Sequence, residues 1–276
     1  MDAKTPHPEF EDRGSLESVR DFPLEDMGGM WFRGQSSCSW SLRPGILRHV
    51  PEFGLDPVAR YENRMYREFR RAAITFFEPS LRQSLAEVYF QAQHSGLPTR
   101  LLDWTTNPLA ALYFAVEPPA CGDEGDAALF ALDNAHVAGP AFEDSSRLNA
   151  CLQALFDEWG PRRGPVKWLT SNDPTCPLPI EPNVRHGRMT QQSSRFTFHF
   201  NVDAWPAGAL RKWRVPREAR RSILYDLESL SVTRATLFPD IDNLARHLSR
   251  QIEPSLRSIV FGESLDSAPQ HPPVGS

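Results

Sequence analysis

The chain has few cysteines, no long apolar run and no excess of positive charge, and each shortage excludes a class of protein. Its four cysteines among 276 residues stand far apart, without the Cys-x-x-Cys spacing of zinc sites, so we expect free thiols and no metal. No apolar segment is long enough to span a membrane. The formal net charge of −5 argues against broad binding to nucleic acid or to an anionic membrane surface, although a local basic patch stays open.

Several sequence signals are also missing. The first residues, Met1–Pro6, are polar and lack the apolar core of a signal peptide, so we expect a cytoplasmic protein. The glycine-rich motifs that bind phosphates and dinucleotides do not occur, and neither does the Gly-x-Ser-x-Gly turn of serine hydrolases. These absences exclude the common nucleotide-binding loops and the α/β-hydrolase class.

The order of periodic segments predicts an α+β fold. Helical spacing of apolar residues predicts helices at 57–77, 80–93, 108–116, 145–159, 216–230 and 241–252. Short β-compatible runs predict strands at 31–34, 126–133, 166–169, 195–200 and 212–215. Because strands and helices do not alternate regularly, we expect one domain over 21–253 with a mixed or antiparallel sheet and flanking helices. A flexible leader at 1–20 and a flexible tail at 254–276 complete the prediction.

The helix at 57–77 carries the clearest amphipathic pattern. One predicted face is apolar and should be buried: Tyr61, Met65, Phe69, Ala72 and Phe76. Another carries arginines that should be solvated: Arg60, Arg64, Arg67 and Arg71. Glu62 is expected to make an internal contact with Arg33 or Arg43.

The most informative segment runs from Gln93 to Val116. Amide, imidazole, guanidinium, carboxylate, indole and hydroxyl groups crowd its first half, and the second half is almost purely apolar. Polar groups that are buried need hydrogen-bond partners, so this segment either lines a site or forms an elaborate network of structural hydrogen bonds. Asn107 before Pro108 is typical of a helix N-cap, and the free amides of such an N-terminus can also bind phosphate.

Five motifs are spread in order over residues 30–250. They are Phe-Arg-Gly-Gln at 32–35, Trp-x-Leu-x-Pro-x-x-x-Arg at 40–48, Gln-His-x-Gly-x-Pro-Thr-Arg-Leu-Leu-Asp-Trp-Thr-x-Asn-Pro at 93–108, Arg-Met-x-x-Gln-x-x-x-Phe at 188–196 and Thr-Leu-Phe-Pro-Asp-x-Asp at 236–242. Together they make the chain resemble the FRG domain family, named for its Phe-Arg-Gly signature. Ser194 stands where the family pattern has glycine, so the loop before it departs from that pattern.

The family layout in turn resembles the ADP-ribosyltransferase superfamily. This resemblance implies NAD as substrate, cleavage of its nicotinamide–ribose bond and transfer of ADP-ribose to a macromolecule or water, as in a bacterial toxin or defence factor. It implies four catalytic candidates: Arg33, His94, Asp103 and Gln192. It implies six NAD-binding candidates: Arg33, Gly34, Gln35, Trp104, Thr105 and Asn107. Arg33 would hold phosphate or ribose, Trp104 would stack on a ring, and Gln192 would orient the ribose or the acceptor.

Other interpretations stay open. Arg33 could pair with Asp103 as a purely structural link, and His94 could be a hydrogen-bonded structural residue. Because Gln192 cannot act as a general base, the same cleft could belong to a binding module for a nucleotide or protein partner without turnover. A hydrolase built on Asp103 and His94 lacks a second clustered acid for a metal.

Overall fold

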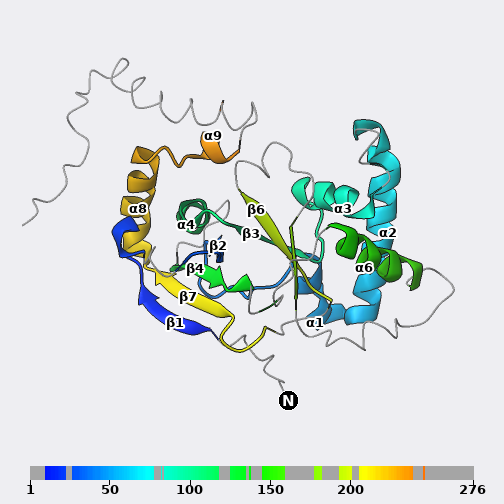
Figure 1. Cartoon of the computed structure of the whole chain (residues 1–276), viewed down its shortest axis with the longest axis horizontal. Coiled ribbons are helices and arrows are strands. Elements are labelled where there is room, and N and C mark those ends of the chain that lie inside the picture. The colour runs from blue at the N-terminus through cyan, green and yellow to red at the C-terminus, as the bar shows by residue number, and fades with distance from the viewer. Residues whose placement is uncertain are drawn as a thin grey trace, which may run out of the picture.

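The computed structural model describes residues 10–22, 27–77, 82, 84–117, 125–134, 137, 145–158, 177–181, 193–200, 205–238 and 245. The strands are β1 (Glu11–Ser15), β2 (Trp31–Gln35), β3 (Leu101–Thr105), β4 (Ala127–Leu132), β5 (Leu178–Ile180), β6 (Ser194–Phe198) and β7 (Leu210–Val215). The α-helices are α1 (Val50–Phe53), α2 (Leu55–Ala73), α3 (Leu85–His94), α4 (Pro108–Val116), α6 (Ser145–Glu158), α8 (Arg217–Ser229) and α9 (Arg234–Leu237). The predicted α+β class with a mixed sheet is confirmed (Figure 1).

The seven strands lie in the order β1-β7-β4-β2-β3-β6-β5. All neighbours are antiparallel except β1 and β7. The β2–β4 and β3–β6 ladders each contain five residue pairs, whereas β2 and β3 meet at one pair, Phe32 with Thr105. The sheet therefore consists of two well-paired halves joined at a single point.

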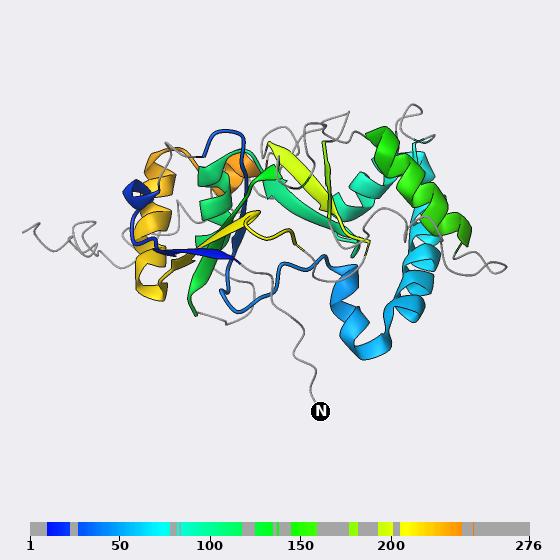
Figure 2. The ribbon, with the colours of Figure 1, turned by 60° about the horizontal axis from the view of Figure 1, so that its bottom comes forward.

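Each half has its own helices with a core beneath them, and a third core that includes Trp31 and Trp104 spans both halves. On one half, α4 and α8 pack against β2, β4 and β7 around side chains such as Phe32, Leu129 and Trp213. On the other, α3 and α6 pack against β3, β5 and β6 around Tyr89 and Phe198. Figure 2 shows α4 and α8 at one end of the molecule and α2, α3 and α6 at the other. The junction of β2 and β3 lies between the two packed ends.

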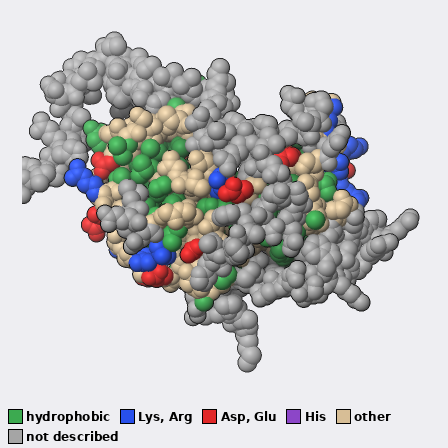
Figure 3. Space-filling view, in the orientation of Figure 1, with side chains coloured by type: hydrophobic (Ala, Val, Ile, Leu, Met, Phe, Trp, Pro, Cys, Tyr) green, Lys and Arg blue, Asp and Glu red, His purple; other side chains and the backbone are tan. Residues whose placement is uncertain are grey.

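The buried face of α2 differs from the predicted one. Its buried residues are Val58, Ala59, Glu62, Asn63 and Tyr66. Tyr61 and Phe76, which were expected inside, are 56% and 86% exposed. The prediction holds in part for Met65 and Phe69, which are partly buried against the core. It was wrong for Tyr61 and Phe76 because it ranked faces by apolar content, whereas Glu62 turns inward to a buried cation. The four predicted arginines are exposed, and Figure 3 shows basic side chains gathered along the side formed by α2.

The flexible leader predicted for residues 1–20 is wrong over residues 11–16. Strand β1 pairs in parallel with β7, and Leu16 after it is fully buried and donates its N–H to the Arg214 carbonyl. The sequence Glu-Asp-Arg-Gly-Ser has no apolar alternation, so the strand is held by backbone hydrogen bonds, by the following leucine and by polar contacts of Glu11 with Arg211 and of Ser15 with Arg214.

Three other predicted segments, at 166–169, 241–252 and 254–276, lie outside the described residues. Strand β5 lies between the predicted strands at 166–169 and 195–200, where the sequence predicts no helix or strand. Among the helices that the structure describes, none has the length and apolar character needed to cross a membrane.

Candidate functional site

A cavity of about 280 Å³ lies where β2 and β3 separate. Its lining consists of Phe32, Arg33, Gly34, Asp103, Trp104, Thr105, Phe114, Ser194 and Phe238. Five of these are residues that the sequence nominated: Arg33, Gly34, Asp103, Trp104 and Thr105. The cavity thus combines an aromatic wall with one guanidinium, one carboxylate and two hydroxyl groups.

Arg33 is the most unusual side chain of the cavity. Its Nη1 donates to the backbone carbonyl of Asp103 at 2.8 Å, but lies 4.0 Å from the carboxylate Oδ2 of that residue. Its Nε is buried and has no hydrogen-bond partner among the described residues. Burial lowers the pKa of Arg33, the carboxylate of Asp103 opposes this effect, and the charge of Arg48 adds to it. Because arginine stays protonated in proteins, this guanidinium is a cation whose donors are only partly used.

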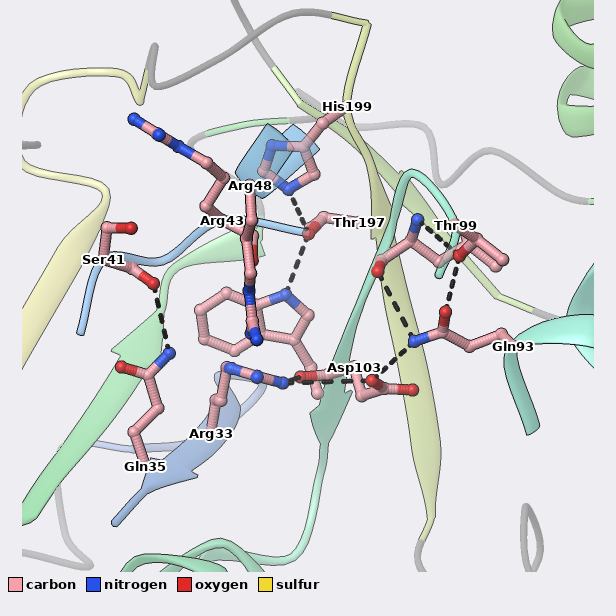
Figure 4. Close-up of polar contacts among 12 residues, drawn as sticks. Arg33, Gln35, Ser41, Arg43, Arg48, Gln93, Thr99, Asp103, Thr197 and His199 are labelled. Atoms are coloured by element: carbon pink, nitrogen blue, oxygen red, sulfur yellow. Dashed lines mark hydrogen bonds and ion pairs between the residues drawn. The ribbon is translucent and has the colours of Figure 1, made fainter. Parts of the chain in front are cut away.

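Asp103 is held by a chain of polar side chains. The Nε2 of Gln93 donates to its Oδ2 at 2.8 Å, and the hydroxyl of Thr99 donates to Gln93 Oε1 at 2.5 Å (Figure 4). The side chain of Asp103 is 56% exposed. Gln93 and Thr99 thus orient a carboxylate that solvent or a ligand can reach.

Residues 28–124 match the model of the FRG domain family. This segment of the chain is similar to the FRG domain. The predicted resemblance is confirmed over that segment, which contains β2, α2, α3, β3 and α4. No curated protein and no solved structure matches the chain, so these comparisons give the ADP-ribosyltransferase likeness no support. The FRG match supplies Arg33 and Asp103, whereas Ser194 and Phe238 of the cavity come from later in the chain.

Trp104 belongs to a buried chain of hydrogen-bonded side chains that continues through Thr197 to His199. Its Nε1 donates to the hydroxyl of Thr197 at 2.9 Å, and that hydroxyl lies 2.9 Å from Nε2 of His199. Burial, together with the positive charges of Arg33 and Arg100, lowers the pKa of His199 to about 3, so the imidazole is neutral near pH 7. Because Trp104 is only 3% exposed, it offers a ligand little ring surface on which to stack.

Sequence reasoning missed Thr197 and His199. Strand β6 has alternating polar and apolar side chains, which predicts a polar face in water, but Thr197 and His199 are both buried. Their partners, Trp104 on β3 and Trp205 after β6, cover that face. The hydroxyl–imidazole spacing of two residues on one strand was the available signal, and it pointed to a buried network only once the neighbouring strand was known.

Gly34 has a packing role at the floor of the cavity. A Cβ built on it would lie 1.9 Å from the carbonyl oxygen of Ala111 and 2.5 Å from the backbone nitrogen of Ala115. The backbone of α4 therefore approaches β2 more closely than any side chain at position 34 permits. The glycine of the Phe-Arg-Gly signature is explained by helix packing alone.

Three other candidates, His94, Gln35 and Asn107, are not among the residues that line the cavity. His94 is exposed at the end of α3, and Gln35 is buried with its Nε2 3.5 Å from the carbonyl of Ser41. Asn107 caps α4, and its Oδ1 accepts from the N–H groups of Leu109 and Ala110. Gln192 lies outside the described residues. The backbone just after it has a positive φ of 49° at Ser193, one residue before the position where the family pattern has glycine.

Glu62 pairs with Arg100, and not with Arg33 or Arg43 as predicted. Its Oε2 accepts from Arg100 Nε at 2.6 Å, and its Oε1 accepts from the hydroxyl of Tyr89 at 2.5 Å. Arg100 also donates to the carbonyl of Phe200 at 2.6 Å. Burial and the charge of Glu62 raise the pKa of Tyr89 well above its usual value. This closed network links α2, α3 and β3 and carries no ligand-facing group.

Proposed function

We propose that the cavity binds NAD and that the domain cleaves its nicotinamide–ribose bond, passing ADP-ribose to a macromolecule or to water. The observation that carries this proposal is the pairing of an underused guanidinium with an oriented, accessible carboxylate in one cavity. The guanidinium of Arg33 suits a phosphate or the ribose hydroxyls, because its fork of donors matches such oxygens.

Asp103 would act on the charge that develops during cleavage. When the bond between ribose C1′ and the nicotinamide nitrogen breaks, its electron pair leaves with nicotinamide, and the ribose becomes a cationic oxocarbenium. A carboxylate fixed next to that cation stabilises it more in the transition state than in the ground state. A water or acceptor hydroxyl then forms the new C1′–O bond and releases a proton to solvent.

The aromatic wall suits the nicotinamide ring. Phe114 and Phe238 are partly exposed and line one part of the cavity, and their rings meet edge to face with centroids 5.8 Å apart. Planar rings bind well against such surfaces. Because a cavity of about 280 Å³ is small for a dinucleotide, we assign it the nicotinamide riboside half.

The test is release of nicotinamide from NAD, with melting temperature measured in parallel. We expect release by the wild-type chain and a loss of roughly 100-fold in Asp103→Asn, the size seen when one electrostatic group is removed from a transition state. Asp56→Asn, an exposed aspartate on α2, is the matched control and should behave as wild type. Absence of both nicotinamide release and an NAD-induced rise in melting temperature would refute the proposal.

A second function, binding without turnover, is favoured by one observation. Among the described lining residues, Asp103 is the only carboxylate, and no histidine or second acid accompanies it to activate a nucleophile. In that case NAD raises the melting temperature but is recovered intact, and Arg33→Gln abolishes the rise.

A further inference from the structure

The guanidinium of Arg33 is less well satisfied than its burial requires. Its Nη1 donates to the carbonyl of Asp103, whereas the carboxylate of Asp103 is 4.0 Å away and already accepts a hydrogen bond from Gln93. Arginine carries five N–H donors, and the buried Nε donor has no partner in the described part of the chain. A buried donor without an acceptor costs free energy, so such groups point to something that binds there.

A second cation faces Arg33. Figure 4 shows the side chain of Arg48 directed toward the guanidinium of Arg33, and the charge of Arg48 lowers the pKa of Arg33. Arg48 is itself held in place, since its Nε donates to the carbonyl of Arg43 at 3.3 Å. It lies on a short turn, Ile46–His49, which is anchored by two buried side chains and by the bond from Ile46 N–H to the carbonyl of Thr99.

The charges around this point do not balance. Arg48 adds a second positive charge beside Arg33, whereas the carboxylate of Asp103 is half exposed and accepts from the Gln93 amide, and the nearby His199 is neutral. Arg33 is largely buried and Arg48 is exposed. Two cations held near each other repel, and an anion between them removes that repulsion. The cost of holding Arg48 toward Arg33 is offset when such an anion is present.

We propose that Arg33 and Arg48 together form a phosphate subsite beside the cavity. A phosphate oxygen would accept from the unused donors of Arg33, and a second oxygen would accept from Arg48. This inference deepens the proposed function and rests on it for the identity of the nucleotide: the phosphate is then the one next to the nicotinamide ribose. The subsite itself depends only on the two arginines and is tested with an anion alone.

The experiment titrates inorganic pyrophosphate into the full-length chain and measures heat of binding and melting temperature at constant ionic strength. We expect saturable binding by the wild type and at least a tenfold weaker affinity in Arg48→Gln, which keeps a polar side chain but removes the charge. Arg64→Gln, an exposed arginine on α2, is the matched control and should bind as tightly as wild type. Nicotinamide riboside, which has no phosphate, should bind Arg48→Gln and wild type equally.

Each outcome separates the subsite from the proposed function. Pyrophosphate binding that needs Arg48, in a chain that neither binds nor cleaves NAD, supports the subsite and removes NAD as the ligand. NAD cleavage with the same Michaelis constant in Arg48→Gln and wild type supports the proposed function and overturns the subsite. Equal loss of pyrophosphate affinity in Arg48→Gln and Arg64→Gln also overturns it, because the anion then responds to overall charge.

Discussion

The FRG segment contains two arginine–carboxylate pairs that are built in opposite ways. Arg100 and Glu62 meet at 2.6 Å with side chains 2% and 1% exposed, and Tyr89 completes the carboxylate. Arg33 and Asp103 stand 4.0 Å apart with side chains 17% and 56% exposed, and a buried donor of Arg33 is left over. The same two kinds of charge form a closed structural link in one place and an open site in the other.

The difference lies in where the acceptors come from. Arg100 finds them on two elements, the carboxylate of α2 and the carbonyl of Phe200 after β6, so its fork is directed at the protein. Arg33 donates to the backbone carbonyl of Asp103, at the point where β2 and β3 separate. A pair that bridges packed elements has little freedom to admit a ligand, whereas one at a gap between strands has room for it.

The largest expected effect is on the closed pair. Arg100→Leu leaves Glu62 charged and buried without its cation, which should lower the free energy of unfolding by about 3–5 kcal/mol. Urea unfolding of this variant and of the exposed Arg64→Leu gives the measurement, and the control should change by less than about 0.5 kcal/mol. If Arg100→Leu lowers the free energy of unfolding no more than the control does, Arg100 and Glu62 are not a closed structural pair.

The next effect concerns the floor of the open site. In Gly34→Ala the new methyl group meets the backbone of α4, which cannot move without disturbing the core, so we expect a loss of about 3 kcal/mol. Gly28→Ala is the control, because a Cβ there meets nothing within 4 Å. If both variants melt at the same temperature, close packing of α4 is not what position 34 requires.

The charges of both Arg33 and Arg100 act on His199, so this residue makes the free energy of unfolding depend on pH. Its pKa is about 3 in the folded chain, below the ordinary value of 6.5, so the unfolded state binds more protons between these values. Stability is therefore full above pH 6.5 and falls as the pH drops toward 3. Between pH 7 and pH 5 the wild type should lose about 2 kcal/mol more than His199→Gln. Urea unfolding at both pH values, with the exposed His49→Gln as control, measures this difference.

The smallest effect is on the stability of the open pair. Asp103→Asn keeps the backbone carbonyl that accepts from Arg33 and removes a half-exposed charge, so the free energy of unfolding should change by less than about 1 kcal/mol. The same variant should lose nicotinamide release. A stability loss as large as that of Arg100→Leu would mean that Asp103 is structural, as the alternative interpretation of the sequence held.

Local patterns predicted much of this molecule. The helices at α3, α4, α6 and α8 and the strands at β2, β4, β6 and β7 follow from period, capping and turn residues, and Asn107 caps α4 as predicted. The gathering of Arg33, Asp103, Trp104 and Thr105 around one cavity was also expected from their motifs. Each of these features depends on residues near one another in sequence or on a motif with a fixed order.

Pairing between distant residues was beyond the sequence. The partner of Glu62, the burial of His199 and the reason for Gly34 depend on which element packs on which, and a pattern along one chain segment does not contain that information. Strand β1 was missed for the same reason, since the backbone bonds and polar side-chain contacts that keep it in the sheet are made to β7, much later in the chain.

The sequence by itself determined the local elements and the chemical groups available, because period, capping and motif order are properties of neighbouring residues. Only the tertiary structure decided that Arg100 is fully paired inside the protein and that Arg33 is left with an unused donor beside a cavity. This difference depends on the single residue pair at which β2 meets β3 and on the acceptors that other elements bring within reach. The sequence specifies which charged side chains are present, whereas packing determines how many hydrogen-bonding partners each of them finds in the protein.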